Sequence, residues 1–192
     1  MQAIETVIGD WQAFIAKILE KTAAAGFDLG DFSQMDHICY RTISLDNYKK
    51  KKEDLVGFGT LLGETMVNGR PISTFRLNQP LIYDKWRVDA LELPAPKEGK
   101  SFKEGLEHSE FVIYDSKENF LKKYSDKEFD LRAADRGINP EIGFSFKDEY
   151  AVKFHLLNLP TVVFLENKLG IREVADNAWK GLYKNPLRRL VI

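Results

Sequence analysis

The chain has 192 residues, of which 44% are hydrophobic and 30% are charged, and its formal net charge is -1. This length suits one sizeable domain or two small modules that share a core. The charge gives no overall attraction to nucleic acid or an anionic membrane, and apolar runs such as 161–165 are much shorter than the roughly 20 residues that span a bilayer. With one cysteine and no basic secretory leader, we expect a cytoplasmic protein with neither a nucleic-acid nor a membrane partner.

Periodicity in the first half predicts a helix and then a module of one strand, one helix and three strands. Apolar residues recur at helical spacing near the N-terminus, so an amphipathic helix should fill much of residues 2–25. The module's own helix is expected to be capped by Ser44 or Asp46 and to carry a solvated lysine face. Asn-Gly at 68–69 indicates a hairpin. The predicted segments are a strand at 35–43, a helix at 44–58, and strands at 60–67, 72–77 and 86–93.

The second half repeats this order of elements. It predicts a strand at 105–113, a helix at 116–126, and strands at 129–134, 142–148 and 150–157. Such a long-period repeat predicts an α+β fold of two βαβββ modules. An extended piece at 161–165 and a helix at about 171–183 should follow. The predicted divisions are an N-terminal helical flank, two modules and a C-terminal extension packed on the same domain, at residues 1–30, 31–97, 98–159 and 160–192.

Two of the three histidines stand in the same local pattern. His37 and His108 each directly follow an acidic residue near the start of the first strand of a module. Aligning DALELPAP at 89–96 with VKFHLLNLP at 152–160 places Glu92 opposite His155. Residues two apart on a strand share a face, so the histidines should lie on the face opposite the apolar, helix-packed one.

Imidazole and carboxylate groups together suit a borderline divalent metal such as zinc, iron(II), nickel, cobalt or manganese. A single strand histidine is more often a satisfied or exposed residue without a ligand. Three histidines in matching positions, with a carboxylate in the fourth, favour a shared site. The hypothesis depends on the duplication, because no pair of ligands has a diagnostic close spacing such as HxH.

The βαβββ duplication with ligands on first and fourth strands resembles the vicinal oxygen chelate superfamily, which includes glyoxalase I, extradiol dioxygenases and bleomycin-resistance proteins. The motifs DHICYR, ETMVNGRPISTFRL, LELPAP, EGLEHSEFVI and VKFH, within residues 35–155, resemble the YecM family of bacterial proteins. The resemblance implies a paired half-barrel around a metal in a shared cavity, with His37, Glu92, His108 and His155 at the metal-binding positions. Histidine at 155 replaces the glutamate of glyoxalase I, which argues against glyoxalase activity.

Two further residues are candidate catalytic groups. Glu110 shares a face with His108, so it is predicted to orient a ligand or act as a general base, although a solvated strand glutamate is an equally good interpretation. Arg41 shares a face with His37, and its guanidinium is predicted to clamp an oxygen of the substrate. Weaker candidates for the same work are Arg70, Arg76 and Lys153.

These observations predict a metal-dependent isomerase, lyase or dioxygenase. Its metal would act as a Lewis acid on two neighbouring oxygens of a small organic substrate. The alternative is a non-catalytic protein that binds or sequesters a small molecule, as bleomycin-resistance proteins do. A third possibility is a structural or regulatory partner protein. A monomer and a homodimer both remain open.

Overall fold

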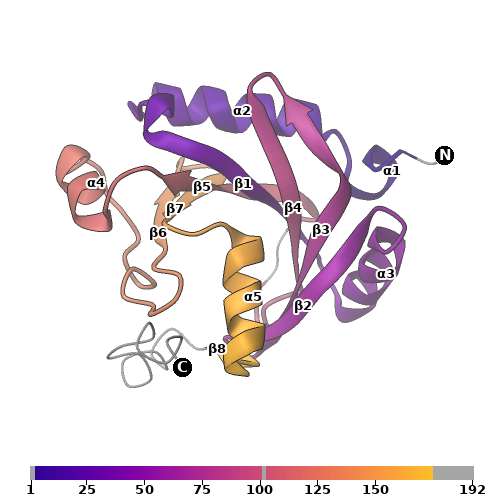
Figure 1. Cartoon of the computed structure of the whole chain (residues 1–192). Helices are drawn as coiled ribbons and strands as arrows, with labels where there is room; N and C mark the ends of the chain where they lie inside the picture. Colours follow the sequence, from indigo (N-terminus) through magenta and orange to yellow (C-terminus); the bar gives the residue numbers. More distant parts are fainter. Residues whose placement is uncertain (1–2, 101–102, 175–192) are drawn as a thin grey trace.

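The computed structural model describes residues 3–100 and 103–174, and in these ranges eight strands form one curved, mixed sheet (Figure 1). The sheet order is β6-β7-β5-β1-β4-β3-β2-β8. The strands are β1 (Phe32–Arg41), β2 (Gly59–Val67), β3 (Arg70–Tyr83), β4 (Trp86–Pro94), β5 (Gly105–Ile113), β6 (Ile142–Ser145), β7 (Ala151–His155) and β8 (Glu173–Val174). The helices are α1 (Glu5–Ile8), α2 (Trp11–Ala24), α3 (Leu45–Leu55), α4 (Lys117–Lys123) and α5 (Leu159–Leu169).

The sheet has an approximate two-fold relation at its centre. β1 and β5 are antiparallel neighbours, with Ile38 opposite Ser109. On its other side β1 pairs in parallel with β4, and β5 pairs in parallel with β7. The first strands of the modules therefore meet at the middle of the sheet, each flanked by the last strand of its own module. This is the predicted α+β arrangement of two related half-barrels.

The first module follows its prediction closely. Ser44 caps α3 by accepting a hydrogen bond from the backbone N–H of Asn47. Asn68 and Gly69 have φ values of 50° and 79° and join β2 to β3, as expected for a hairpin turn with both central residues in the left-handed region. β3 is longer than predicted and runs through Pro80, which lies in an irregular stretch of the β3–β4 pairing. Proline is tolerated at such irregularities because it donates no hydrogen bond to the ladder.

The predicted second strand of the second module, at residues 129–134, is wrong. Within the described ranges this segment makes one isolated bridge, from Asp130 to Gly143. Turns follow, and Leu131 is 48% exposed, so the segment has no buried alternating face to hold it in the sheet. The second module therefore has a loop wall where the first has the β2–β3 hairpin.

The two ends of the chain also differ from their predictions. The N-terminal helix is divided into α1 and α2 because Gly9 adopts a φ of 82° and Asp10 starts a new helix as its N-cap. The predicted extended piece at 161–165 is helical and belongs to α5, which Asn158 caps by accepting from the N–H of Thr161. Most of the helix predicted at about 171–183 lies outside the described residues, and β8 occupies residues 173–174.

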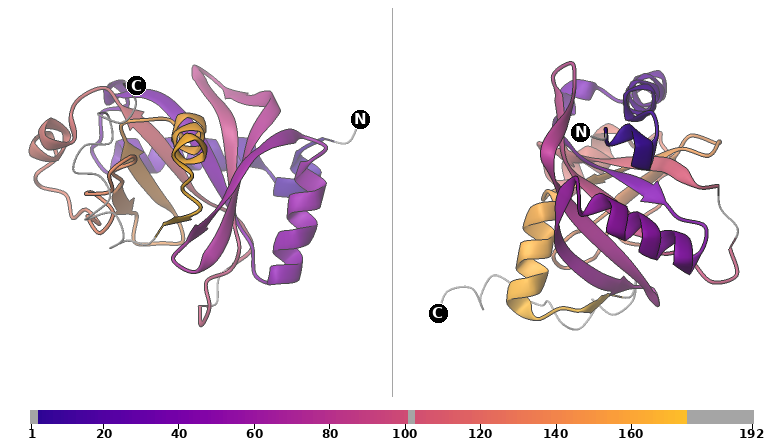
Figure 2. Two further views of the ribbon diagram at one scale, coloured as in Figure 1. Left: turned by 60° about the horizontal axis from the view of Figure 1, so that its bottom comes forward. Right: turned by 90° about the vertical axis from the view of Figure 1, so that its right-hand side faces the viewer.

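The two faces of the sheet have different roles. α2 crosses one face (Figure 1), where Phe111, Ile113, Val152 and Phe154 belong to the hydrophobic core. On the opposite face α5 packs against β2 and β3 and lies between the two groups of strands (Figure 2). In the part of the chain that is described, no helix is both long and apolar enough to cross a membrane. On this side His37 and His108 line a cavity together with residues of α5.

Candidate metal centre

A β-bulge precedes the histidine on each of the two central strands. Asp36 on β1 and Glu107 on β5 have no partner residue in the described β1–β5 ladder. The two neighbours of Asp36 pair with consecutive residues of β5, and the two neighbours of Glu107 pair with consecutive residues of β1. A bulge bends a strand and re-aims a side chain. Each acidic side chain therefore lies beside the histidine that follows it, although neighbours on a regular strand face opposite sides.

The two acid–histidine pairs hold the imidazole rings in the same way. His37 Nδ1 lies 2.8 Å from Asp36 Oδ2, and His108 Nδ1 lies 3.1 Å from Glu107 Oε2. A carboxylate only accepts hydrogen bonds, so Nδ1 carries the proton in both rings. This leaves Nε2 of each ring to face the centre of the sheet.

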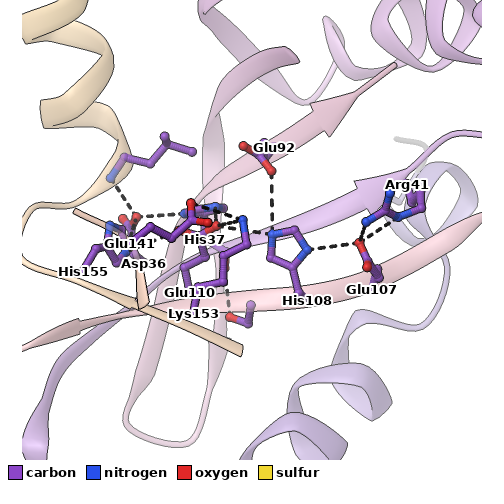
Figure 3. Close-up of polar contacts among 12 residues, drawn as sticks. Asp36, His37, Arg41, Glu92, Glu107, His108, Glu110, Glu141, Lys153 and His155 are labelled. Atoms are coloured by element: carbon purple, nitrogen blue, oxygen red, sulfur yellow. Dashed lines mark hydrogen bonds and ion pairs between the residues drawn. The ribbon is translucent and has the colours of Figure 1, made fainter. Parts of the chain in front are cut away.

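The inward Nε2 atoms meet two carboxylates (Figure 3). His37, Glu92, His108 and Glu110 each offer one ligand atom, and these atoms lie within 4.8 Å of one another. Glu110 Oε1 is 3.4 Å from His37 Nε2 and 3.3 Å from His108 Nε2, while Glu92 Oε2 is 3.8 Å from His108 Nε2. These four residues are called the candidate ligand group below.

The candidate ligand group fits a divalent metal ion. Both Nε2 atoms are buried, and neither has a hydrogen-bond partner among the residues that the structure describes, which is costly for a polar atom unless a ligand satisfies it. Metal-bound histidines usually donate their other ring N–H to a carboxylate or carbonyl group, as these two do. Two imidazoles and two carboxylates suit zinc, iron(II) and the related borderline ions.

The charges within the candidate ligand group depend on one another. Burial alone would lower the pKa of His37, but the Glu110 and Asp36 carboxylates raise it to about 10. Burial alone would raise the pKa of Glu110, but Lys153 and the two histidines hold it well below its usual range. The buried carboxylates are thus stabilised by positive charge at the centre of the group. Protons on the imidazoles or a divalent cation can supply that charge.

The strand register corrects the predicted alignment of the fourth strands. Cys39 on β1 pairs with Glu92 on β4. The two-fold mate of Cys39 is Glu110 on β5, and Glu110 pairs with Lys153 on β7. Lys153 is therefore the equivalent of Glu92, and the alignment of Glu92 with His155 is wrong by two residues. Residues two apart share a strand face, so this shift left the predicted face unchanged.

His155 lies beside the candidate ligand group rather than within it. It forms a second buried set with Asp36 and His37, in which its Nε2 is 3.5 Å from Asp36 Oδ2. Its Nδ1 is 3.2 Å from Asn139 Oδ1. Burial lowers the pKa of His155, so its ring is neutral at physiological pH. The structure thus brings together three of the four predicted ligands and adds Glu110.

Two of the predicted basic residues, Arg41 and Lys153, are ion-paired. Arg41 donates from Nε and Nη2 to Glu107 Oε2, the same oxygen that faces His108 Nδ1. Lys153 Nζ is 2.8 Å from Glu110 Oε1. Arg41 therefore supports an acid–histidine pair, and Lys153 contacts the candidate ligand group directly.

The candidate ligand group opens into a cavity of about 390 Å³. α5 forms one wall with Leu159, Val162, Val163 and Glu166, and the loop after α4 forms another. Six basic residues line the cavity: Arg41, Arg70, Lys97, Arg132, Arg136 and Lys153. Six acidic residues do so as well: Glu92, Glu107, Glu110, Asp130, Glu141 and Glu166. The lining charges balance, with the histidines counted as neutral.

Two supporting residues were missed at the level of sequence. The roles of Asp36 and Glu107 depend on bulges, which no periodicity reveals, although the repeated acid–histidine order was visible as a signal. Arg76 does not line the cavity, whereas Arg70 and Lys153 do.

Comparisons with known proteins agree with this fold. Residues 3–166 match the sequence model of a family described as YecM protein. Protein YecM of Escherichia coli (strain K12) is 31% identical over 113 residues, which covers 57% of this chain and 58% of that protein. The match thus spans little more than half the length of this curated relative.

Two solved structures show the same architecture. The structural genomics protein EC4020 matches 86% of this chain and 97% of its own, with a TM-score of 0.66 and 23% identity. A variant of methylmalonyl-CoA epimerase from Streptomyces coelicolor, in complex with 2-nitronate-propionyl-CoA, matches 67% of this chain and 96% of its own, with a TM-score of 0.50 and 16% identity. At these identities the similarity demonstrates the fold, which is that of the vicinal oxygen chelate superfamily.

Proposed function

The chain belongs to the YecM family, and from this premise and the geometry of the candidate ligand group we propose that it is a metal-dependent enzyme acting on a small oxygen-bearing organic molecule. The observation that carries the proposal is the pair of buried Nε2 atoms of His37 and His108, each ring held at Nδ1 by a carboxylate. This is how proteins commonly orient histidine for metal binding.

We assign His37, Glu92 and His108 as the residues that hold the metal. Two imidazoles and one carboxylate form the donor set common in iron(II) oxygenases, and it leaves positions open for substrate. A bound divalent ion would supply Lewis acidity toward two neighbouring substrate oxygens. The same set serves isomerase, lyase and dioxygenase chemistry, so the reaction type follows from what the surrounding residues do.

Glu110 is assigned as the general base. Its side chain is 3% exposed, and Lys153 holds it through Oε1. Its carboxylate lines the cavity, where it can accept a proton from a substrate carbon or hydroxyl. Arg41 acts through Glu107, which keeps the ring of His108 in place.

The proposal is tested first by the metal content of the purified protein and then by turnover. We expect a divalent ion in the wild-type protein, and loss of activity when a chelator removes it. Small compounds with oxygens on adjacent carbons can be screened by NMR in D2O, which reports proton exchange, and with an oxygen electrode, which reports oxygenation. Glu110→Gln should keep its metal and lose turnover.

The same measurements test the alternative function. A protein that stays metal-free after incubation with each candidate ion, and binds apolar or aromatic compounds without converting them, would be a sequestration protein of the bleomycin-resistance type. That result would overturn the enzyme assignment, because the buried Nε2 atoms would then have no role in metal binding.

A further inference from the structure

Lys153 stands where the two-fold relation of the sheet would place a fourth metal ligand. Its mate Glu92 belongs to the candidate ligand group, and the two residues occupy equivalent positions on β7 and β4. An ammonium group has three N–H donors and no lone pair for a metal. On the side of β7 the group therefore meets an ammonium group, where β4 supplies a carboxylate (Figure 3).

The ammonium group of Lys153 lies between two carboxylates. Its ion-pair partners in the described ranges are Glu110 at 2.8 Å and Glu141 at 3.4 Å. With three donors on Nζ, one N–H remains for a ligand in the cavity.

The charge balance of the cavity favours such a donor. Six basic and six acidic residues line it, and the buried Asp36 carboxylate beside His37 is a seventh acidic group, so a divalent ion would leave the site with a net charge of about +1 if the histidines are neutral. Glu141 also lies 3.4 Å from Arg136 Nη1, so Lys153 shares that carboxylate with a second cation. A ligand with a negative charge beside the metal would complement this excess.

We propose that Lys153 determines substrate specificity by binding an anionic oxygen of the substrate. The site then takes small carboxylates with a second oxygen on the adjacent carbon, such as 2-oxo and 2-hydroxy acids, in preference to neutral compounds with the same two oxygens. This inference rests on the proposed metal site, because the metal both creates the positive excess and faces the two oxygens.

The test compares two ligands of similar size on the full chain loaded with cobalt(II). Pyruvate carries the carboxylate, and hydroxyacetone is its neutral counterpart with oxygens on the same carbons. Calorimetry gives both affinities, and the visible absorption of cobalt reports a change in its coordination. Since hydrogen bonds to charged groups are strong, we expect pyruvate to bind the wild-type protein at least about tenfold more tightly than hydroxyacetone.

Substitution then assigns that preference to one side chain. Lys153→Met should weaken pyruvate binding about tenfold and leave hydroxyacetone binding unchanged. Its cobalt affinity should be equal or higher, because a neighbouring cation is removed. Lys103→Met is the matched control: Lys103 is paired with Glu149 at an exposed position and does not line the cavity. Lys153→Gln serves if the methionine variant does not fold.

Three results would overturn the inference. They are equal binding of the two ligands by the wild-type protein, unchanged pyruvate affinity in the Lys153 variants, and loss of cobalt from those variants. The first needs no variant, so a folding defect cannot hide it. Failure of the proposed metal site would look different: the wild-type protein would take up no cobalt, or His108→Ala would bind it equally well.

Discussion

The two modules provide the same nitrogen ligands but opposite charges at the proposed metal site. Each begins with a bulged strand on which a carboxylate holds the histidine that follows it. On the fourth strand the first module presents Glu92 and the second presents Lys153. The backbone symmetry that brings the histidines together therefore does not require symmetric chemistry, and the site has an ammonium group from β7 where β4 supplies a carboxylate.

The walls of the cavity also differ between the two modules. The first module contributes the β2–β3 hairpin, while the second contributes a loop that contacts the sheet through the bridge from Asp130 to Gly143. Arg132 and Arg136 of that loop line the cavity. The same loop brings Asp130 and Glu141 to the cavity, and Arg132 and Arg136 are ion-paired with these two carboxylates.

The largest expected effect concerns the part of the site in which the modules agree. His37→Ala and His108→Ala should each weaken metal binding by more than about 100-fold, since removing a ligand costs more than removing its supporting residue. The two losses should be of similar size, because the residues are two-fold mates. Calorimetric titration of the metal-free variants measures both.

His155→Asn is the matched control for this pair. His155 is as buried as His37, but it lies outside the candidate ligand group. Its substitution should change metal affinity less than either alanine variant does. An equal loss of metal affinity would show that His155 is also a metal ligand.

Substitutions of the two supporting carboxylates should weaken metal binding to a similar extent but lower the free energy of unfolding by different amounts. Glu107→Gln and Asp36→Asn should each weaken metal binding by roughly 10–100-fold, because the histidine loses a charged partner. Asp36 also accepts a 2.7 Å hydrogen bond from the N–H of Leu159 at the start of α5. Asp36→Asn should therefore lower the free energy of unfolding by roughly 1–2 kcal/mol more than Glu107→Gln does. Urea titration checks this, and equal losses would contradict it.

Making the modules alike should strengthen metal binding. Lys153→Glu places a carboxylate at the mate of Glu92 and removes a cation, so metal affinity should rise roughly tenfold. The metal-free variant should be less stable than the wild-type protein, because Glu110 and Glu141 lose their common partner. Thermal unfolding with and without the ion shows both changes, and a weaker affinity would argue against the two-fold equivalence.

The sequence predicted the fold because its signals were local and repeated. The acid–histidine order placed His37 and His108 correctly as mates. The predicted equivalence of Glu92 and His155 was wrong because a shift of two residues preserves the alternation of faces along a strand. Only the parallel β5–β7 pairing fixes that register. The β-branched run at 161–165 suggested an extended piece, although the Asn158 cap and Gly170 at the C-terminus are helix signals.

The smallest expected effect concerns two glutamates, Glu64 on β2 and Glu166 on α5, which contacts the next residue of β2. Glu166 on α5 accepts a hydrogen bond from Thr65 Oγ1 at 3.1 Å, and burial raises its pKa. Burial would also raise the pKa of Glu64, but Lys52, Tyr48 and Ser73 lower it below its usual value. The two carboxylates should therefore affect stability in opposite directions as the pH changes.

The sign of each effect follows from linkage between proton binding and folding. A raised pKa in the folded state means that the stability from Glu166 is present below its unfolded pKa of about 4.3 and is lost as the pH rises through the higher folded value. Glu166→Gln should therefore make the metal-free protein more stable relative to wild type at pH 7 than at pH 4. Glu64→Gln should do the reverse, because its stability is present above the unfolded pKa and disappears as the pH falls through the lower folded value. Urea unfolding of both variants at the two pH values measures the difference. If the two variants shifted in the same direction, α5 would not bury Glu166 against β2, and the closed wall beside the first module would have to be reconsidered.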